Sequence, residues 1–154
     1  MDDGARDFDL ERFVTAQAPV FADSLAELQR GRKTGHWMWF VFPQMRGLGQ
    51  SPTALHYGVA SAAEARAYLA HPVLGPRLQA CCEALLALPD TAAGPTAASI
   101  FGSPDDLKLK SSMTLFEVAA ASNPEARRLF SDVLARFHAG QRDARTLAML
   151  STSA

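Results

Sequence analysis

Prolines, glycines and helix-capping residues divide this chain into short segments, and most of these segments space their apolar residues as a helix does. Strands are not indicated, because no segment shows a convincing two-residue alternation and the usual hairpin dipeptides are absent. Helix starts are predicted at Asp9, Pro19, Ser51, Ser61, Ser103, Asn123 and Asp143, with a further helix after Pro72. The sequence therefore predicts an all-α fold of about seven short-to-medium helices.

One domain accounts for the length of 154 residues. The composition, 48% hydrophobic and 20% charged, is typical of a globular protein and not of a disordered chain. We expect the domain to cover residues 8–150, with flexible tails at 1–7 and 151–154. The net charge of −1 argues against a nucleic-acid partner and against attraction to an anionic membrane surface.

The first residues and the cysteines favour a reduced, cytoplasmic protein. Residues 1–4 are acidic and lack the apolar stretch of a signal peptide. Cys81 and Cys82 are adjacent, so in a helix their side chains diverge and a mutual disulfide is not expected. A cytoplasmic location is therefore the expectation.

The run from His36 to Gln44, HWMWFVFPQ, holds both tryptophans of the chain. It is too short to cross a membrane, which takes about 20 apolar residues. Its content leaves helix and strand open for residues 37–42. Two interpretations follow: Trp37 and Trp39 belong to the core, or they line a pocket for a planar ligand with polar groups at both ends of the run. The glycine-rich residues 45–50 could then close over that pocket.

A second informative segment begins at Ser103. Ser103 is expected to cap a helix that has Pro104 in its first position and continues to about Ala121. The polar residues of this helix include Asp105, Lys108, Ser111, Ser112 and Thr114. Serines lower helix propensity, so their presence in mid-helix suggests an anion-binding patch. The alternative is a solvated helix face with an Asp–Lys pair.

Other chemical signatures are missing from the sequence. The four histidines are scattered without metal-ligand spacing, so no metal site is predicted. There is no phosphate loop and no nucleophile elbow. No cofactor is predicted. The short basic cluster Arg30, Arg32 and Lys33 is interpreted as solvated surface.

Four stretches of the sequence resemble a bacterial family of unknown function (domain of unknown function 1810), some of whose members are labelled calpastatin. They are residues 35–44, 57–58, 68–78 and 101–116. The resemblance implies a compact, mainly α-helical single domain and brings no established activity. Calpastatins are disordered protease inhibitors, whereas this chain has the apolar content of a folded domain, so the label's function is not carried over.

The leading hypothesis is that the aromatic run and the helix after Ser103 meet in one pocket for a small anionic, nucleotide-like ligand. The expected ligand-binding residues are His36, Trp37, Trp39, Gln44, Tyr57, Asp105, Lys108, Ser111, Ser112 and Thr114. One alternative is a non-catalytic protein-interaction domain with the aromatic run as core, although no particular protein partner is indicated. A third is a hydrolase of a NAD-derived or ADP-ribosyl compound, with His36 or Asp105 as acid or base. The sequence does not decide whether the protein is an enzyme.

Overall fold

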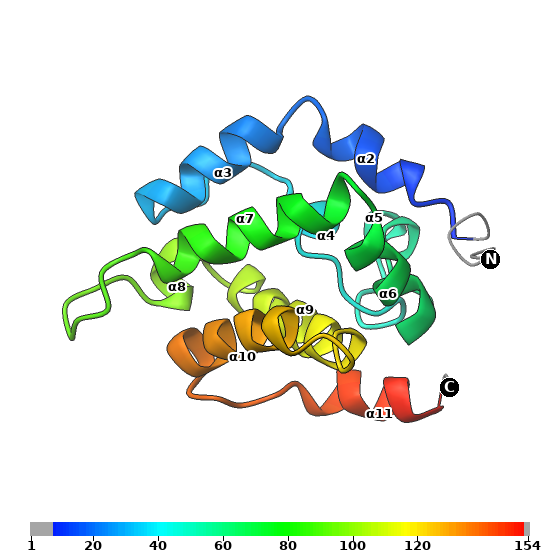
Figure 1. The fold of residues 1–154 in the computed structure, drawn as a ribbon. Helices are drawn as coiled ribbons and strands as arrows, with labels where there is room; N and C mark the ends of the chain where they lie inside the picture. The colour runs from blue at the N-terminus through cyan, green and yellow to red at the C-terminus, as the bar shows by residue number, and fades with distance from the viewer. Residues whose placement is uncertain (1–7, 153–154) are drawn as a thin grey trace.

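A computed structural model describes residues 8–152, and these residues form ten helices and no strand (Figure 1). The helices are α2 (Glu11–Gln17), α3 (Phe21–Arg30), α4 (Met38–Val41), α5 (Pro52–His56), α6 (Ala62–Ala70), α7 (Leu74–Leu86), α8 (Ala97–Phe101), α9 (Asp105–Ala119), α10 (Pro124–His138) and α11 (Ala144–Thr152). The all-α prediction is confirmed, but the expected number of about seven helices is too low. Of the predicted flexible tails, residues 1–7 and 153–154 lie outside the described residues, whereas 151–152 complete α11.

The additional helices are short. Residues 38–41 form the four-residue α4, which settles the helix-or-strand question for the aromatic run. The five-residue α8 was not predicted, although its sequence carries a signal. Thr96 and Ser99 form a capping box, in which each side chain accepts a hydrogen bond from the backbone N–H of the other.

Four predicted caps are confirmed by a hydrogen bond from the backbone N–H of the third residue of each helix. The capping acceptors are the side-chain oxygens of Ser51, Ser61, Asn123 and Asp143. Two other predicted caps are wrong. Ser103 does not cap α9, because the carbonyl groups of Gly102 and Pro104 already accept the first amides of that helix. Asp9 has a φ of 49° and does not cap α2, whose N-cap residue is Leu10.

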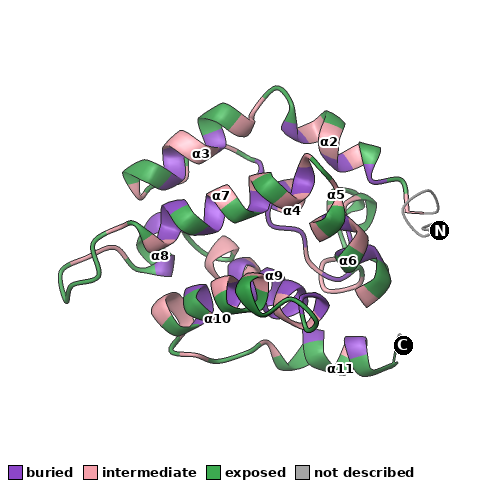
Figure 2. Ribbon diagram, in the orientation of Figure 1, coloured by how far each residue is buried: buried purple, intermediate pink, exposed green. Residues whose placement is uncertain are grey.

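Helix α9 lies at the centre of the fold, in contact with α6, α8, α10 and α11. Figure 1 shows α2 and α3 along one side of the molecule, α7 beside them, and α11 on the opposite side beyond α10. Because neighbours surround α9, every residue from Ser111 to Phe116 is buried, as its purple colour in Figure 2 shows. No helix among the described residues is long and apolar enough to cross a membrane.

Candidate functional site

Four of the predicted ligand-binding residues, from separate segments, line one small cleft. They are Trp39 from α4, Gln44 from the segment after it, Tyr57 at the end of α5 and Lys108 in the first turn of α9; Met38, Phe42, Ala54 and Gly58 complete the lining. The cleft encloses about 10 Å³, which is near the minimum needed to hold one water molecule. The fold therefore brings the aromatic run and the helix after Ser103 together, as expected, around a narrow space.

Lys108 supplies the positive charge of the cleft. Its Nζ atom lies 4.8 Å from the centroid of the Trp39 ring and 3.3 Å from Oδ1 of Asp105, one helical turn earlier. The lysine side chain is 23% exposed, so water or a ligand can reach it. An ammonium group over an indole face is attracted by the ring's electron density, and this attraction fixes Lys108 beside the cleft.

A second lysine shares the same carboxylate. Lys33 Nζ lies 2.9 Å from Oδ2 of Asp105, donates to the Gly35 carbonyl and stands 5.2 Å from the centroid of the Trp37 ring. Its side chain is only 8% exposed, so the interpretation of Lys33 as solvated surface is wrong. Asp105 therefore joins two lysines, each on a tryptophan face, and this cluster carries a formal charge of +1.

Trp37 is a core residue that anchors the segment before the cleft. Its indole Nε1 donates to Oε1 of Glu27, which also accepts the backbone N–H groups of Thr34 and Gly35. Burial acts to raise the pKa of Glu27, but the hydrogen bonds from Gly35, Thr34 and Trp37 outweigh it and lower that pKa overall. The ionised Glu27 carboxylate thus fixes residues 34–37, which precede α4.

Tyr57 is fixed in the cleft wall by its neighbours on both sides. Its ring packs against Phe13 and Phe40, with centroids 6.0 and 5.3 Å away. The Arg12 guanidinium donates to the carbonyl groups of His56 and Gly58, the two residues that flank Tyr57, and pairs with buried Glu64 at 2.9 Å. Arg12 of α2 therefore holds the backbone on both sides of Tyr57 in place.

The segment from Met45 to Gln50 follows Gln44 and, at Gly49, passes close to two residues that line the cleft, Ala54 and Gln44. At Gly49 there is no room for a side chain, since an added Cβ would lie 2.8 Å from Ala54 Cβ and 4.0 Å from Gln44 Nε2. The base of the segment is held by a parallel bridge between Met45 and Val59. Glycine at position 49 thus allows the chain to pass close to Ala54.

The other predicted site residues lie elsewhere. Ser111 and Thr114 are buried and donate to the carbonyl groups four residues earlier, those of Leu107 and Lys110, and Thr114 also accepts the Asp143 N–H. Ser112 is fully buried, and His36 is exposed; neither lines the cleft. Asp105 does not line the cleft, but it pairs with Lys108, which does. The hydroxyl groups of α9 therefore form neither a solvated face nor part of the cleft wall.

Metal-binding geometry is absent from residues 8–152, where no group of three or more His, Cys, Asp or Glu side chains is arranged to hold an ion. Sequence reasoning missed four lining residues of the cleft and also Lys33, which pairs with Asp105 next to it; the four are Met38, Phe42, Ala54 and Gly58. The apolar residues carry no sequence signal for a site. A signal for Lys33 existed in Gly35 and Trp37, which follow it closely in the sequence.

The comparisons with known proteins identify a family and a fold. The model of a family described as "Protein of unknown function (DUF1810)" matches residues 7–150. The crystal structure of the conserved hypothetical protein Rv1873 from Mycobacterium tuberculosis is similar, with 52% sequence identity and a TM-score of 0.85. This similarity covers 94% of the present chain and 98% of the other. None of the curated proteins matches the chain.

Proposed function

Because the chain belongs to the DUF1810 family of proteins of unknown function, which supplies no activity to carry over, we propose from the cleft alone that it binds a small anionic, nucleotide-like ligand beside Trp39 and Lys108. The observation that carries the proposal is the position of Lys108. An ammonium group has three donors, and here it lies within reach of solvent at the mouth of an aromatic cleft.

The cleft chemistry fits an anion joined to a planar group. Lys108 would bind a phosphate or carboxylate oxygen, for which a lysine serves as a point charge. Trp39 and Tyr57 offer aromatic surface for a planar group. The Gln44 amide has both donors and an acceptor, which suits the edge of a base or an amide. These four side chains would therefore recognise two different parts of one ligand.

The size of the cleft determines how such a ligand would enter. A space of about 10 Å³ admits one oxygen-sized group, so a planar group needs the cleft to widen, and we propose that the Met45–Gln50 segment next to Gln44 moves outward. Met45 is buried in the core and bridges to Val59, whereas the end of the segment has a local hydrogen bond from Gln50 to the Gly47 carbonyl. We expect ligand binding to reorder this segment and to leave the helices in place.

The hydrolysis hypothesis receives less support from the geometry. His36 is exposed and does not line the cleft. Both carboxylate oxygens of Asp105 pair with lysines, so this residue positions ammonium groups beside the cleft. We therefore propose binding and no particular reaction.

A thermal-shift screen with AMP, NAD, ADP-ribose and a sugar phosphate tests the proposal. A ligand at 100 times its Kd stabilises a protein by about 2.7 kcal/mol, so a positive compound raises Tm clearly. The variant Lys108→Met should lose that shift, because its side chain still packs against Trp39 but has no charge. Lys110→Met, two residues along the same helix and outside the cleft lining, is the matched control and should keep the shift. Equal shifts in both variants would refute the assignment.

A further inference from the structure

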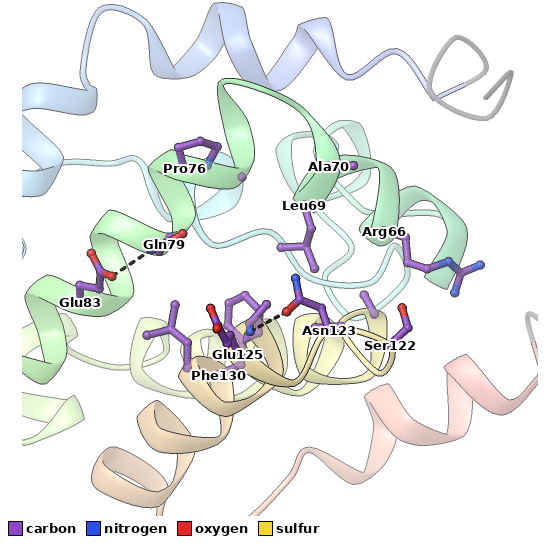
Figure 3. Close-up of a pocket in the computed structure, with 15 residues that line it drawn as sticks. Arg66, Leu69, Ala70, Pro76, Gln79, Glu83, Ser122, Asn123, Glu125 and Phe130 are labelled. Carbon is purple, nitrogen blue, oxygen red and sulfur yellow. Dashed lines mark hydrogen bonds between the residues drawn. The ribbon is translucent and has the colours of Figure 1, made fainter. Parts of the chain in front are cut away.

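A cavity separate from the Trp39–Lys108 cleft shares no residue with it. It has a volume of about 650 Å³ and lies where α6 and α7 face the start of α10 (Figure 3). Ligand sites for small molecules commonly fall between 300 and 1,000 Å³, so its size is sufficient for a molecule of roughly ten non-hydrogen atoms or more.

The floor of this cavity is apolar. It is formed by Leu69 of α6, Ala119 at the end of α9, and Ala126, Leu129 and Phe130 of α10. Leu69, Ala126 and Leu129 remain partly accessible, whereas Phe130 is buried beneath them. An apolar body placed on this floor would gain the free energy of removing both surfaces from water.

The polar rim of the cavity consists mainly of hydrogen-bond acceptors. Gln79 donates its amide to Glu83, which leaves the Gln79 carbonyl oxygen and the second Glu83 oxygen as acceptors on α7. Glu125 adds a second carboxylate from α10, on the opposite side. Asn123 uses its oxygen to cap α10, so its NH₂ group is the amide donor left on that wall. This inventory suits a ligand that brings N–H donors.

The charge of the rim points to the same class of ligand. Glu83 and Glu125 carry two negative charges, and Arg66 is the single cation among the lining residues. Figure 3 shows Arg66 at one end, with its guanidinium directed away from Gln79 and Glu83. The lining of this cavity therefore carries a net negative charge, in contrast to the Trp39–Lys108 cleft, which has one lysine and no acid among its lining residues.

We propose that this cavity binds a small amphipathic amine, with its protonated nitrogen between Glu83 and Glu125 and its apolar body on Leu69, Ala126 and Leu129. The inference does not depend on the anionic ligand proposed for the other cleft, since the two sites use different residues and opposite charge. We infer the class of ligand from the hydrogen-bond acceptors and carboxylates on the rim and from the apolar floor beneath them.

Three probes of similar size and different charge test the proposal: 2-phenylethylamine, 3-phenylpropionate and 2-phenylethanol. Methyl NMR spectra of the full chain are recorded during each titration. The amine should shift the methyl resonances of Leu69, Ala126 and Leu129 in a saturable way, with a dissociation constant on the order of 1 mM. The carboxylate should bind roughly three- to tenfold more weakly, because the rim carboxylates are exposed and their attraction is screened.

Two variants separate charge from shape. The double variant Glu83→Gln/Glu125→Gln should lose the preference for the amine, whereas Asp132→Asn, an exposed acid on α10 outside the lining, should keep it. Ala126→Leu should weaken all three probes by filling the floor. Equal binding of amine and carboxylate to the wild type would overturn the amine assignment. No saturable shift of these methyl groups with any probe would overturn the site itself.

Discussion

The Nζ atom of Lys108 stands 4.8 Å from the centroid of the Trp39 ring, and this contact joins the aromatic run to the central helix α9. The two residues belong to segments far apart in the sequence, and each was expected to contribute to one site. Their contact is the geometric basis for assigning an anion to the small cleft. Because Lys108 is also tied to Asp105, its position does not depend on Trp39 alone.

The Lys108–Trp39 contact predicts a measurable coupling energy. In a double-mutant cycle of Lys108→Met and Trp39→Leu, the free energy of unfolding should show a coupling of about 0.5–1 kcal/mol, typical of a cation–π pair with some solvent access. Urea denaturation at neutral pH is the measurement. The pair Lys110 and Trp39 serves as control, with no coupling expected. A coupling near zero for Lys108 and Trp39 would mean that the ammonium is not held on the ring.

Glu27 predicts a specific loss of stability in acid. Its pKa is lowered in the folded protein, so its contribution is present above the unfolded-state pKa and is lost as the pH falls through the folded-state pKa. The Glu27→Gln variant should be less stable than the wild type by about 2 kcal/mol at pH 7, since charge-assisted hydrogen bonds to Thr34, Gly35 and Trp37 are weakened. Urea titrations from pH 7 down to pH 3 should show this difference shrinking. A difference that stays constant over that range would rule out the ionised carboxylate as its source.

Arg12, which holds the backbone beside Tyr57, predicts a large effect on stability. Removing its guanidinium in Arg12→Met leaves the buried Glu64 carboxylate without its ion-pair partner. We expect the free energy of unfolding to fall by about 3 kcal/mol, because an uncompensated buried charge remains. The double variant with Glu64→Gln should lose less than the sum of the single losses. Strict additivity in chemical denaturation would show that the two groups do not act as a pair.

The adjacent cysteines should be unreactive in the folded protein. Both are fully buried, and burial raises the pKa of Cys81 to about 12 and raises that of Cys82 well above its ordinary value. A thiol with a raised pKa has little of the thiolate that reacts with disulfide reagents. Ellman's reagent should therefore label two thiols quickly in denaturant and almost none in buffer. Rapid labelling of one thiol in buffer would contradict the burial of this part of α7.

Local sequence signals predicted most of the helices. Ser51, Ser61, Asn123 and Asp143 cap the helices they were expected to cap, because a cap depends only on residues within one turn. Ser103 is not a cap, because backbone carbonyl groups accept hydrogen bonds from the first amides of α9 in its place. The short α8 was missed because its capping pair, Thr96 and Ser99, is followed by too few apolar residues to show helical spacing.

Tertiary packing decided the parts of the site that the sequence did not reveal. Serine and threonine in mid-helix looked like a polar surface, but Ser111 and Thr114 satisfy their hydroxyls on carbonyl groups of their own helix and can therefore be buried. Lys33 looked like surface because its partner, Asp105, lies in a distant segment. Trp39 and Lys108 were predicted as site residues because each lies in a segment of unusual composition, the aromatic run and the serine-containing helix after Ser103.

The indole N–H resonances of the two tryptophans provide the most direct test of the proposed binding site. Trp37 is locked in the core by its hydrogen bond to Glu27, whereas Trp39 lines the cleft beside Lys108. In ¹H–¹⁵N spectra recorded during titration with AMP, NAD or ADP-ribose, we expect the Trp39 resonance to shift in a saturable way and the Trp37 resonance to stay in place. If the Trp39 resonance does not move with any of these compounds, or if both resonances move together, the Trp39–Lys108 cleft is not the binding site.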